Sequence, residues 1–581
     1  IRFGYNKFQN GIADAVKGSS IFDPAPGIEL AIGADPNCLT AGLDDFCSGP
    51  NFLAPQATIQ ADRQLKYDGS SAYKSHIFRY GFGWNHIHGG GFAEFLGLGP
   101  AVQSPSTATP FNTFPGGAAN PLNYPVTNVT MGNGEGFSTT QSAFGFPGGG
   151  QGPDNRISWY FGDSWKVKPN LTVTYGLRYV RDTGRTDTNL GPLPILDQLS
   201  PGLGKTVTQP NHNFAPQLGV TWDPTKKGKT VFRAGIGLYY ENSIWNNNLF
   251  DPPGRLQSGF FLATQNACLN GQAVTFTLPS GQTVTPSFCG QAIGSVASQI
   301  AQLEQQYQAA TVAAGPAVNP VYMGNIMTSG IDITGTELFA PNYVTPRSVQ
   351  MNFGVQHEIR QGMVLTVDFL RNVATHNLLS VDANHVGDAR TFNQANAQAA
   401  VATTVANCGA ASVAASYTAP CPTDPATGNI DGGTWTPRVA TIADYAANGL
   451  DSGYNFCGGG PCGAAAFPGF NPSFGAVQLL YPVGRSVYNG LQASLRQNVH
   501  NPFRGAKLMN LQVSYSLSRY VSTARDNDFI NFAQDYGNAT RFIGPNGLDR
   551  THQLSFGGYM DLKGGFQATF AAHFSSPLPS D

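Results

Sequence analysis

Charge is scarce in this sequence: only 12% of its 581 residues are Asp, Glu, Lys or Arg, and the formal net charge is −2. No block of Lys and Arg stands out, so the chain lacks the electrostatic footprint of a nucleic-acid-binding protein, and we expect no nucleic-acid partner. A run of about 18 apolar residues is also missing, which argues against a membrane-spanning helix. The first residues, IRFGYNKFQN, have neither the charged start nor the apolar core of a signal peptide. They read as a strand already under way, and the last residues end just after one, so we expect a larger protein to continue beyond both ends.

The sequence motifs of common catalytic sites are missing as well. There is no phosphate-binding glycine loop, no GxSxG nucleophile elbow and no HExxH zinc motif. His86 and His88 stand two apart, with His76 further back, so a metal could bind them on one strand face. Solvated histidines at the rim of a sheet are the alternative that we favour. We expect no enzyme, no metal site and no cofactor, and the loops identify no ligand-binding residue.

What the sequence has in abundance is glycine and aromatic residues, with 70 Gly, 38 Phe and 22 Tyr. The segment from Val231 to Tyr240 shows how they are arranged. Phe232, Ile236 and Tyr240 fall on one face of an extended strand, whereas Arg233 and glycines fall on the other. One face of the predicted strand is therefore apolar and the other is polar or bare.

The same alternation recurs along the chain in pairs of strands separated by short turns. Together with the first strand, the pairs give about thirteen strands in antiparallel hairpins. The predicted hairpins join 59–67 to 76–84 across the turn DGSSAY (68–73), 156–167 to 171–181 across KPN, the two stretches within 213–241, 349–358 to 363–371, 487–497 to 508–520, and 552–561 to 566–574.

The apolar face carries almost no charge, and this asymmetry indicates an all-β fold, an antiparallel transmembrane β-barrel. A charge on a lipid-facing strand costs about 2–4 kcal/mol at mid-depth, whereas Arg, Asp, Gln and Gly can face a watery or plugged lumen. Strands of about ten residues also match the span of a tilted strand across the hydrocarbon. The alternative is a secreted protein of lectin-like β-sandwich domains, which would show similar alternation.

Long segments alternate strictly with the short turns, as the extracellular loops of outer-membrane barrels alternate with periplasmic turns. They cover 9–56, 85–155, 182–211, 242–345, 374–485 and 521–548. We expect all six to be extracellular loops. Within the fourth, residues 295–314 place Val296, Ile300, Leu303 and Tyr307 at helical spacing, which predicts a short helix packed on the loop's own core.

All eight cysteines lie in these long segments, which suggests an oxidising compartment and disulfides that brace the loops. They fall into four local pairs, although eight cysteines allow about 105 pairings and spacing alone does not decide between them. A zinc site is the alternative, but the CxxC spacing typical of one is missing. The candidate disulfide residues are Cys38 and Cys47, Cys268 and Cys289, Cys408 and Cys421, and Cys457 and Cys462.

The segment SWYFGDSWKVKPNLTVTYGLRYV resembles a strand–turn–strand segment of TonB-dependent outer-membrane receptors. NFAPQLGVTWDPTKKGKTVFRAGIGLYYE is similar to the following hairpin in their Oar-like group, and TPRSVQMNFGVQHEIRQGMVLTVDFLRN, SVYNGLQASLRQ, VSYSLSRYVS and LDRTHQLSFGGYMDL continue the likeness in order. The resemblance covers most of the chain outside the loops. It implies a barrel of about 22 strands with an N-terminal plug, driven by the TonB–ExbB–ExbD complex. We expect residues 1–581 to be a partial barrel domain of about thirteen strands, without the plug.

This resemblance implies a protein of the bacterial outer membrane, in contact with its lipid and with an extracellular solute. The expected function is energised uptake, or export, of a large solute such as an oligosaccharide, a siderophore or a peptide. Contact with TonB would be made through an N-terminal region that this chain does not contain. A surface adhesin or a structural barrel without active transport is the alternative.

Overall fold

The computed structural model describes most of the chain outside parts of the long segments. The described residues are 1–12, 23–33, 46–49, 56–93, 100–104, 119–135, 154–186, 188, 190–241, 255, 257–259, 263–318, 338–385, 392–423, 430, 435–450, 465–472, 477–524, 533 and 537–579. None of the described helices is both long enough and apolar enough to cross a bilayer.

One large antiparallel sheet dominates the structure, and each strand in it pairs with the next in chain order. Its thirteen main strands are β1 (Arg2–Ile12), β4 (Gln56–Tyr73), β5 (His76–Ala93), β8 (Asp154–Lys168), β9 (Leu171–Asp182), β10 (Phe214–Trp222), β11 (Thr230–Tyr240), β19 (Arg347–Arg360), β20 (Met363–Asp382), β23 (Gln478–His500), β24 (Ala506–Ser522), β26 (His552–Leu562) and β27 (Gln567–Ser575). Two short strands, β18 (Leu338–Phe339) and β25 (Gly544–Pro545), join its edge at β23 and β24. A single sheet of this length confirms the predicted fold class and shows that the β-sandwich alternative is wrong.

The strands run further than the alternation suggested, so the expected loop boundaries shift. β5 continues to Ala93, β20 to Asp382, and β23 begins at Gln478. The predicted turn at residues 68–73 is wrong, because these residues belong to β4 and the turn consists of Lys74 and Ser75. Gly362 occupies the β19–β20 turn with φ +76°, where a Cβ would lie 2.3 Å from the carbonyl oxygen of Asn498.

The two faces of the sheet differ as the sequence pattern predicts. Side chains in register with Trp159 form what we call the apolar face, and those in register with Tyr160 form the polar face. On the apolar face, Trp165 and Trp222 lie near the short turns, whereas Trp159, Tyr179 and Phe214 cluster further along. Aromatic residues at two levels with aliphatic side chains between them are typical of the lipid-facing wall of an outer-membrane barrel.

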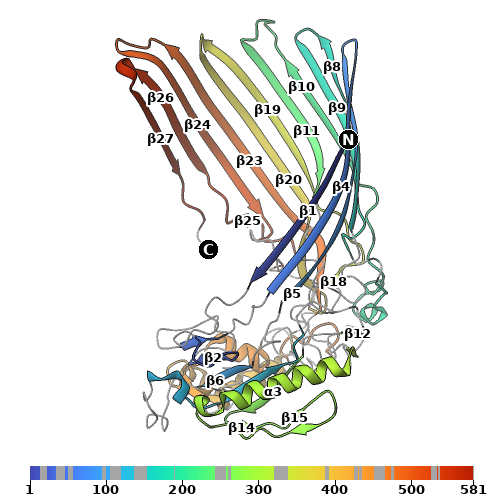
Figure 1. Cartoon of the computed structure of the whole chain (residues 1–581), viewed down its shortest axis with the longest axis vertical. Coiled ribbons are helices and arrows are strands. Elements are labelled where there is room, and N and C mark those ends of the chain that lie inside the picture. Colours follow the sequence, from blue (N-terminus) through green and yellow to red (C-terminus); the bar gives the residue numbers. More distant parts are fainter. Residues whose placement is uncertain are drawn as a thin grey trace.

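The short turns lie at one end of the curved sheet and the long segments gather at the other, which we call the loop end (Figure 1). There, a six-stranded sheet and a helix form the first loop module: β2 (Glu29–Ile32), β3 (Phe46–Ser48), β6 (Ala101–Ser104), β7 (Asn128–Gly132), β13 (Thr264–Leu269), β14 (Gln272–Ala273) and α3 (Ile293–Ala314). Small strand pairs accompany them: β12 (Ser258–Gly259) with β17 (Ala317–Val318), and β15 (Phe276–Thr277) with β16 (Thr283–Val284).

A second loop module is mostly helical. It contains α5 (Gln394–Cys408), α6 (Val413–Ser416), α7 (Ile442–Tyr445), η7 (Ala446–Leu450) and the pair β21 (Cys421–Thr423) and β22 (Trp435–Arg438). Three further single turns of helix are η3 (Pro121–Asn123), η4 (Pro194–Gln198) and η9 (Lys563–Gly565). Each module has its own apolar core, so the long segments are not featureless loops where the structure describes them.

Candidate functional site

A large hollow lies on the polar face of the sheet, across the strands from β4 to β23. It encloses about 1010 Å³ and is lined by side chains and backbone of nine strands. Amide side chains dominate its polar lining on β10, β19 and β20, at Gln217, Gln350, Asn352 and Asn372. We call this hollow the inner groove.

A charged corner of the inner groove is built around Asp68 on β4. The hydroxyl of Tyr160 on β8 donates to its carboxylate at 2.7 Å, Arg2 forms an ion pair with it, and the Lys66 ammonium lies 3.9 Å away. Arg79 on β5 lines the same region. Arg2 and Lys66 pair with the carboxylate and Arg79 adds a third cation to the lining of the groove, so this corner favours an anionic or electron-rich group of a solute.

Glycines form the floor of the groove and keep it wide. Gly162 pairs with Gly176 across β8 and β9, and Gly219 pairs with Gly235 across β10 and β11. At Gly81 the reason for glycine is direct, because a Cβ there would lie 2.4 Å from the ring of Tyr160, which covers this position. The glycines therefore leave space on the polar face along the inner groove that larger side chains would fill.

The first loop module is held by a disulfide and by a buried carboxyl group. Cys268 on β13 is joined to Cys289. Glu304 on α3, only 2% exposed, accepts hydrogen bonds from the backbone N–H of Gly132 at 3.1 and 3.2 Å and from the Gln308 amide at 3.1 Å. Burial raises the pKa of Glu304 to about 8 despite these donors, so the carboxyl is largely protonated at neutral pH.

The helix that carries Glu304 was predicted from its apolar stripe. Val296, Ile300, Leu303 and Tyr307 are all at most 5% exposed and belong to the core of the first loop module. The predicted helix is confirmed, but its core is not the fourth loop's own, because apolar residues of the first and second long segments share it.

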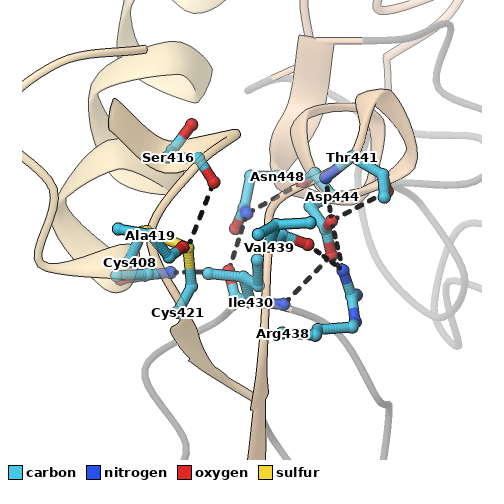
Figure 2. Close-up of polar contacts among 11 residues, drawn as sticks. Cys408, Ser416, Ala419, Cys421, Ile430, Arg438, Val439, Thr441, Asp444 and Asn448 are labelled. Atoms are coloured by element: carbon cyan, nitrogen blue, oxygen red, sulfur yellow. Dashed lines mark hydrogen bonds and ion pairs between the residues drawn. A yellow bond between two sulfur atoms is a disulfide. The ribbon is translucent and has the colours of Figure 1, made fainter. Parts of the chain in front are cut away.

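The second loop module is organised around Asp444 and a disulfide (Figure 2). Asp444 accepts from the backbone N–H of Thr441 at 2.7 Å, from its hydroxyl at 2.9 Å and from the N–H of Ile430 at 3.2 Å, and Arg438 donates to both carboxylate oxygens. Burial alone would raise the pKa of Asp444, but the donors from Arg438 and Thr441 lower it to about 2. Cys408, the last residue of α5, is joined to Cys421 at the start of β21.

A rim network ties the first turns of the loops to the ends of β8, β9 and β11. Arg156 bonds to Asp182 at 2.7 Å, and Arg185 bonds to the other oxygen of Asp182 at 2.9 Å. Arg185 also donates to the Tyr343 hydroxyl at 3.3 Å and to the backbone carbonyl of Glu241. Burial raises the pKa of both Tyr343 and Glu241.

The residues singled out from the sequence lie in different places. His76 bonds to Asp163 at 2.6 Å near the short turns, whereas His86 bonds to the Asn155 side chain at 3.0 Å towards the loop end. In the part of the chain that the structure describes, no three His, Cys, Asp or Glu side chains are grouped to hold a metal ion.

Of the candidate disulfide residues, four form the two disulfides described above and Cys47 is disulfide-bonded. Cys38, Cys457 and Cys462 lie outside the described residues. Sequence reasoning missed the inner groove and both carboxyl centres, Glu304 and Asp444. The runs of glycine on the polar face were the available signal for the groove.

Solved structures similar to this chain include an outer membrane transporter, a siderophore receptor and an iron transporter. The outer membrane transporter YddB from Escherichia coli matches with a TM-score of 0.42 and 11% identity, over 92% of this chain and 44% of its own. The siderophore receptor PirA from Acinetobacter baumannii matches with a TM-score of 0.38 and 10% identity, over 99% and 48%. The FrpB iron transporter from Neisseria meningitidis gives 0.34 and 9%, over 89% and 43%. The chain thus spans less than half the length of each of these three proteins, and no curated protein matches it in sequence.

A family model described as an outer membrane beta barrel domain matches residues 1–578. This match covers nearly the whole chain, and the two-faced thirteen-strand sheet is the structure that such a domain requires. The protein is located in the bacterial outer membrane. The chain belongs to the outer membrane beta barrel domain family.

Proposed function

We propose that the chain forms part of the wall of a TonB-dependent receptor of the Oar-like group, which moves a large solute across the outer membrane. The observation that carries this proposal is the inner groove of about 1010 Å³ on the polar face of an outer-membrane barrel sheet. A groove of this size exceeds what a single small metabolite fills. The proposal contains no catalytic step.

The lining of the groove supports a solute rich in hydroxyl and amide groups. Gln217, Gln350, Asn352 and Asn372 both donate and accept hydrogen bonds, and the charged corner at Asp68 adds cations. Oligosaccharides, peptides and hydroxylated siderophores share this chemistry. Their uptake, or export by the same route, would be energised by TonB–ExbB–ExbD acting on a plug domain.

The six long segments would be extracellular in this proposal, and the two loop modules would meet the solute first. Their disulfides and separate cores also support the alternative of an adhesin, because rigid surface modules suit binding without transport. The two functions differ in whether solute accumulates inside the cell.

The test is an uptake assay with the complete protein expressed in a Gram-negative host, with and without TonB. Labelled oligosaccharide, peptide and ferric siderophore are offered separately. We expect one of them to accumulate only when TonB is present. Accumulation that ignores TonB would refute energised transport, and binding to the cell surface without accumulation would favour the adhesin.

A pair of variants tests the groove itself. Gly219→Phe adds a ring where the nearest atom to a Cβ is 3.8 Å away, so it fills the groove without displacing backbone. Ala234→Phe adds the same bulk to the apolar face of the neighbouring strand. Gly219→Phe should reduce uptake while Ala234→Phe leaves it unchanged; equal uptake by both variants would remove the groove from the path.

A further inference from the structure

Basic side chains on the apolar face of the sheet are not balanced by acidic ones. Leaving aside the ends of β20 and β23 beyond Thr375 and Arg485, the described strand registers place a single carboxylate on this face, Asp163. Asp163 lies near the short turns and is bonded to His76. The described part of this face thus has no acidic residue near the loop end, where it is open to anionic groups from the membrane.

Four arginines of this face gather on β19, β20, β23 and β24. Arg371 lies opposite Asn489, which lies opposite Arg519, so these three form one row across three strands. Arg347 and Arg485 flank Thr375 in a second row, four residues further towards the loop end. The two rows are about 13 Å apart along the strands. We call Arg347, Arg371, Arg485 and Arg519 the arginine cluster.

The side chains of the cluster are available for an external partner. Arg371 donates to the Asn489 amide oxygen at 2.7 Å, which orients its guanidinium without neutralising it. Arg347, Arg485 and Arg519 are exposed. No ion pair joins any of the four to a carboxylate of the described residues, whereas on the polar face Arg233 lies 3.3 Å from Asp368.

The row just below the cluster, towards the short turns, is apolar and exposed. It consists of Phe353, Phe369, Leu491 and Leu517, which pair in that order across the same four strands and are each at least 40% exposed. Arginines towards the loop end and apolar side chains towards the short turns match a lipid molecule, whose charged headgroup lies beyond its acyl chains.

The height of the cluster fits a lipid headgroup. Arg371 is nine residues from Gly362 in the β19–β20 turn, or about 30 Å along the strand. At a strand tilt of about 40° this corresponds to about 23 Å of height, close to the roughly 25 Å of a barrel's apolar band. Arg371 therefore lies at the upper edge of the hydrocarbon, where phosphate groups begin.

We propose that the arginine cluster binds the phosphate of an anionic membrane lipid in the leaflet at the loop end. A guanidinium group can donate two parallel hydrogen bonds to the oxygens of one phosphate. The exposed row of Phe and Leu side chains receives the acyl chains. The site depends on the proposed function only for the name of the leaflet: if the long segments are extracellular, this leaflet is the outer one. Arg371 also contributes to the lining of the inner groove, but the strand register places its side chain, like those of the other three arginines, on the opposite face.

The test uses the complete protein in phosphatidylcholine nanodiscs, with lipid A or dephosphorylated lipid A added and binding followed by native mass spectrometry. Wild-type protein should prefer the phosphorylated form. The double variant Arg371→Gln/Arg519→Gln should bind lipid A about 30-fold more weakly, since each basic residue near a lipid surface contributes about a fivefold effect.

Matched controls separate the site from general charge. Arg496→Gln removes an arginine of β23 on the polar face near the short turns, and Arg371→Lys/Arg519→Lys keeps the positive charge; both should retain the preference for phosphate. Added salt should weaken lipid A binding by the wild type, a readout that needs no variant. Equal binding of the two lipids, or undiminished binding by the double Gln variant, would overturn the site. If the wild-type protein shows no heat-modifiable migration in gel electrophoresis, the barrel itself, and with it the proposed function, is refuted.

Discussion

Replacing Asp444 by Asn tests whether one buried carboxylate organises the second loop module. In the wild type its oxygens accept from Arg438, Thr441 and Ile430 and are fully buried. An asparagine keeps the shape but turns one oxygen into an NH₂ group, which faces donors and cannot accept from them. The Arg438 guanidinium also loses its counter-charge.

The size of the effect follows from the lowered pKa. A shift from 3.8 to about 2 corresponds to about 2 kcal/mol of stabilisation of the charged form. The partner Arg438 is 39% exposed, and solvent screening reduces its share to about 1 kcal/mol. Adding the mismatched donors, we expect Asp444→Asn to destabilise the module by about 2–3 kcal/mol.

Hydrogen exchange of the α7 and η7 amides is the appropriate assay, because unfolding of the barrel would not report on a loop module. A loss of about 2 kcal/mol speeds exchange about 30-fold when opening is local. Because the folded pKa is lowered, the stabilisation is complete above pH 3.8 and is lost as pH falls towards 2. Wild-type protection, corrected for intrinsic exchange, should therefore decrease in that window.

Asp197→Asn is the matched control, since Asp197 accepts from the backbone N–H groups of Gly202 and Gly204 in a different segment. It should leave exchange in α7 unchanged. Unchanged protection of α7 in Asp444→Asn, or no loss of wild-type protection between pH 3.8 and 2, would refute the role assigned to Asp444.

Three further predictions concern other parts of the chain. Glu304→Gln should leave exchange of α3 unchanged at pH 6 and remove its increase at pH 9, because the raised pKa means that stability falls as pH rises from 4.5 through about 8; an alkaline increase that persists in the variant would contradict this. Gly81→Ala should lower the heat-modifiable fraction in outer-membrane preparations, since its Cβ would meet a tyrosine ring at 2.4 Å and a backbone oxygen at 2.6 Å, while Gly83→Ala, which meets only a serine hydroxyl at 2.9 Å, should not. Replacing Cys268 and Cys289 by Ser should cost the first loop module about 3 kcal/mol and hasten its proteolysis, with reductant having the same effect on the wild type; resistance equal to that of the oxidised protein would count against this.

The sheet could be predicted from the sequence because two environments impose a pattern with a period of two residues. The strand expected at Val231–Tyr240 is β11, Thr230–Tyr240, and β8 turns into β9 at KPN, where Lys168 is already paired with Leu171. The turn predicted at residues 68–73 failed because its Gly and Ser residues are compatible with a strand when a neighbour covers them. Gly69 lies beneath the ring of Tyr80, where a Cβ would be 2.6 Å away, so a bare position in β4 is filled from β5.

The loop modules could not be predicted in the same way, because their pairings join distant segments. β2 pairs in parallel with β6, and β7 pairs with β13 from a third long segment. No local periodicity records such contacts. Helix α5 carried a weak signal in the Asn393 cap, whose side chain accepts from the N–H of Asn396, and in Gly409 at φ +67°, but its alanine-rich face has little amphipathic contrast.

Charge pairing follows the same division between the faces of the sheet. On the polar face, Asp68 and Asp368 have cationic partners within the chain, as expected where a solute or a folded domain could come close. On the apolar face, Arg347 and Arg519 have no carboxylate partner among the described residues, although an unpaired arginine there is tolerated only near the membrane surface. A partner outside the chain resolves this, and lipid phosphate is the anion available at that height. The side chains of the inner groove therefore face an aqueous lumen and those of the arginine cluster face the membrane, so Gly219→Phe should leave lipid A binding unchanged.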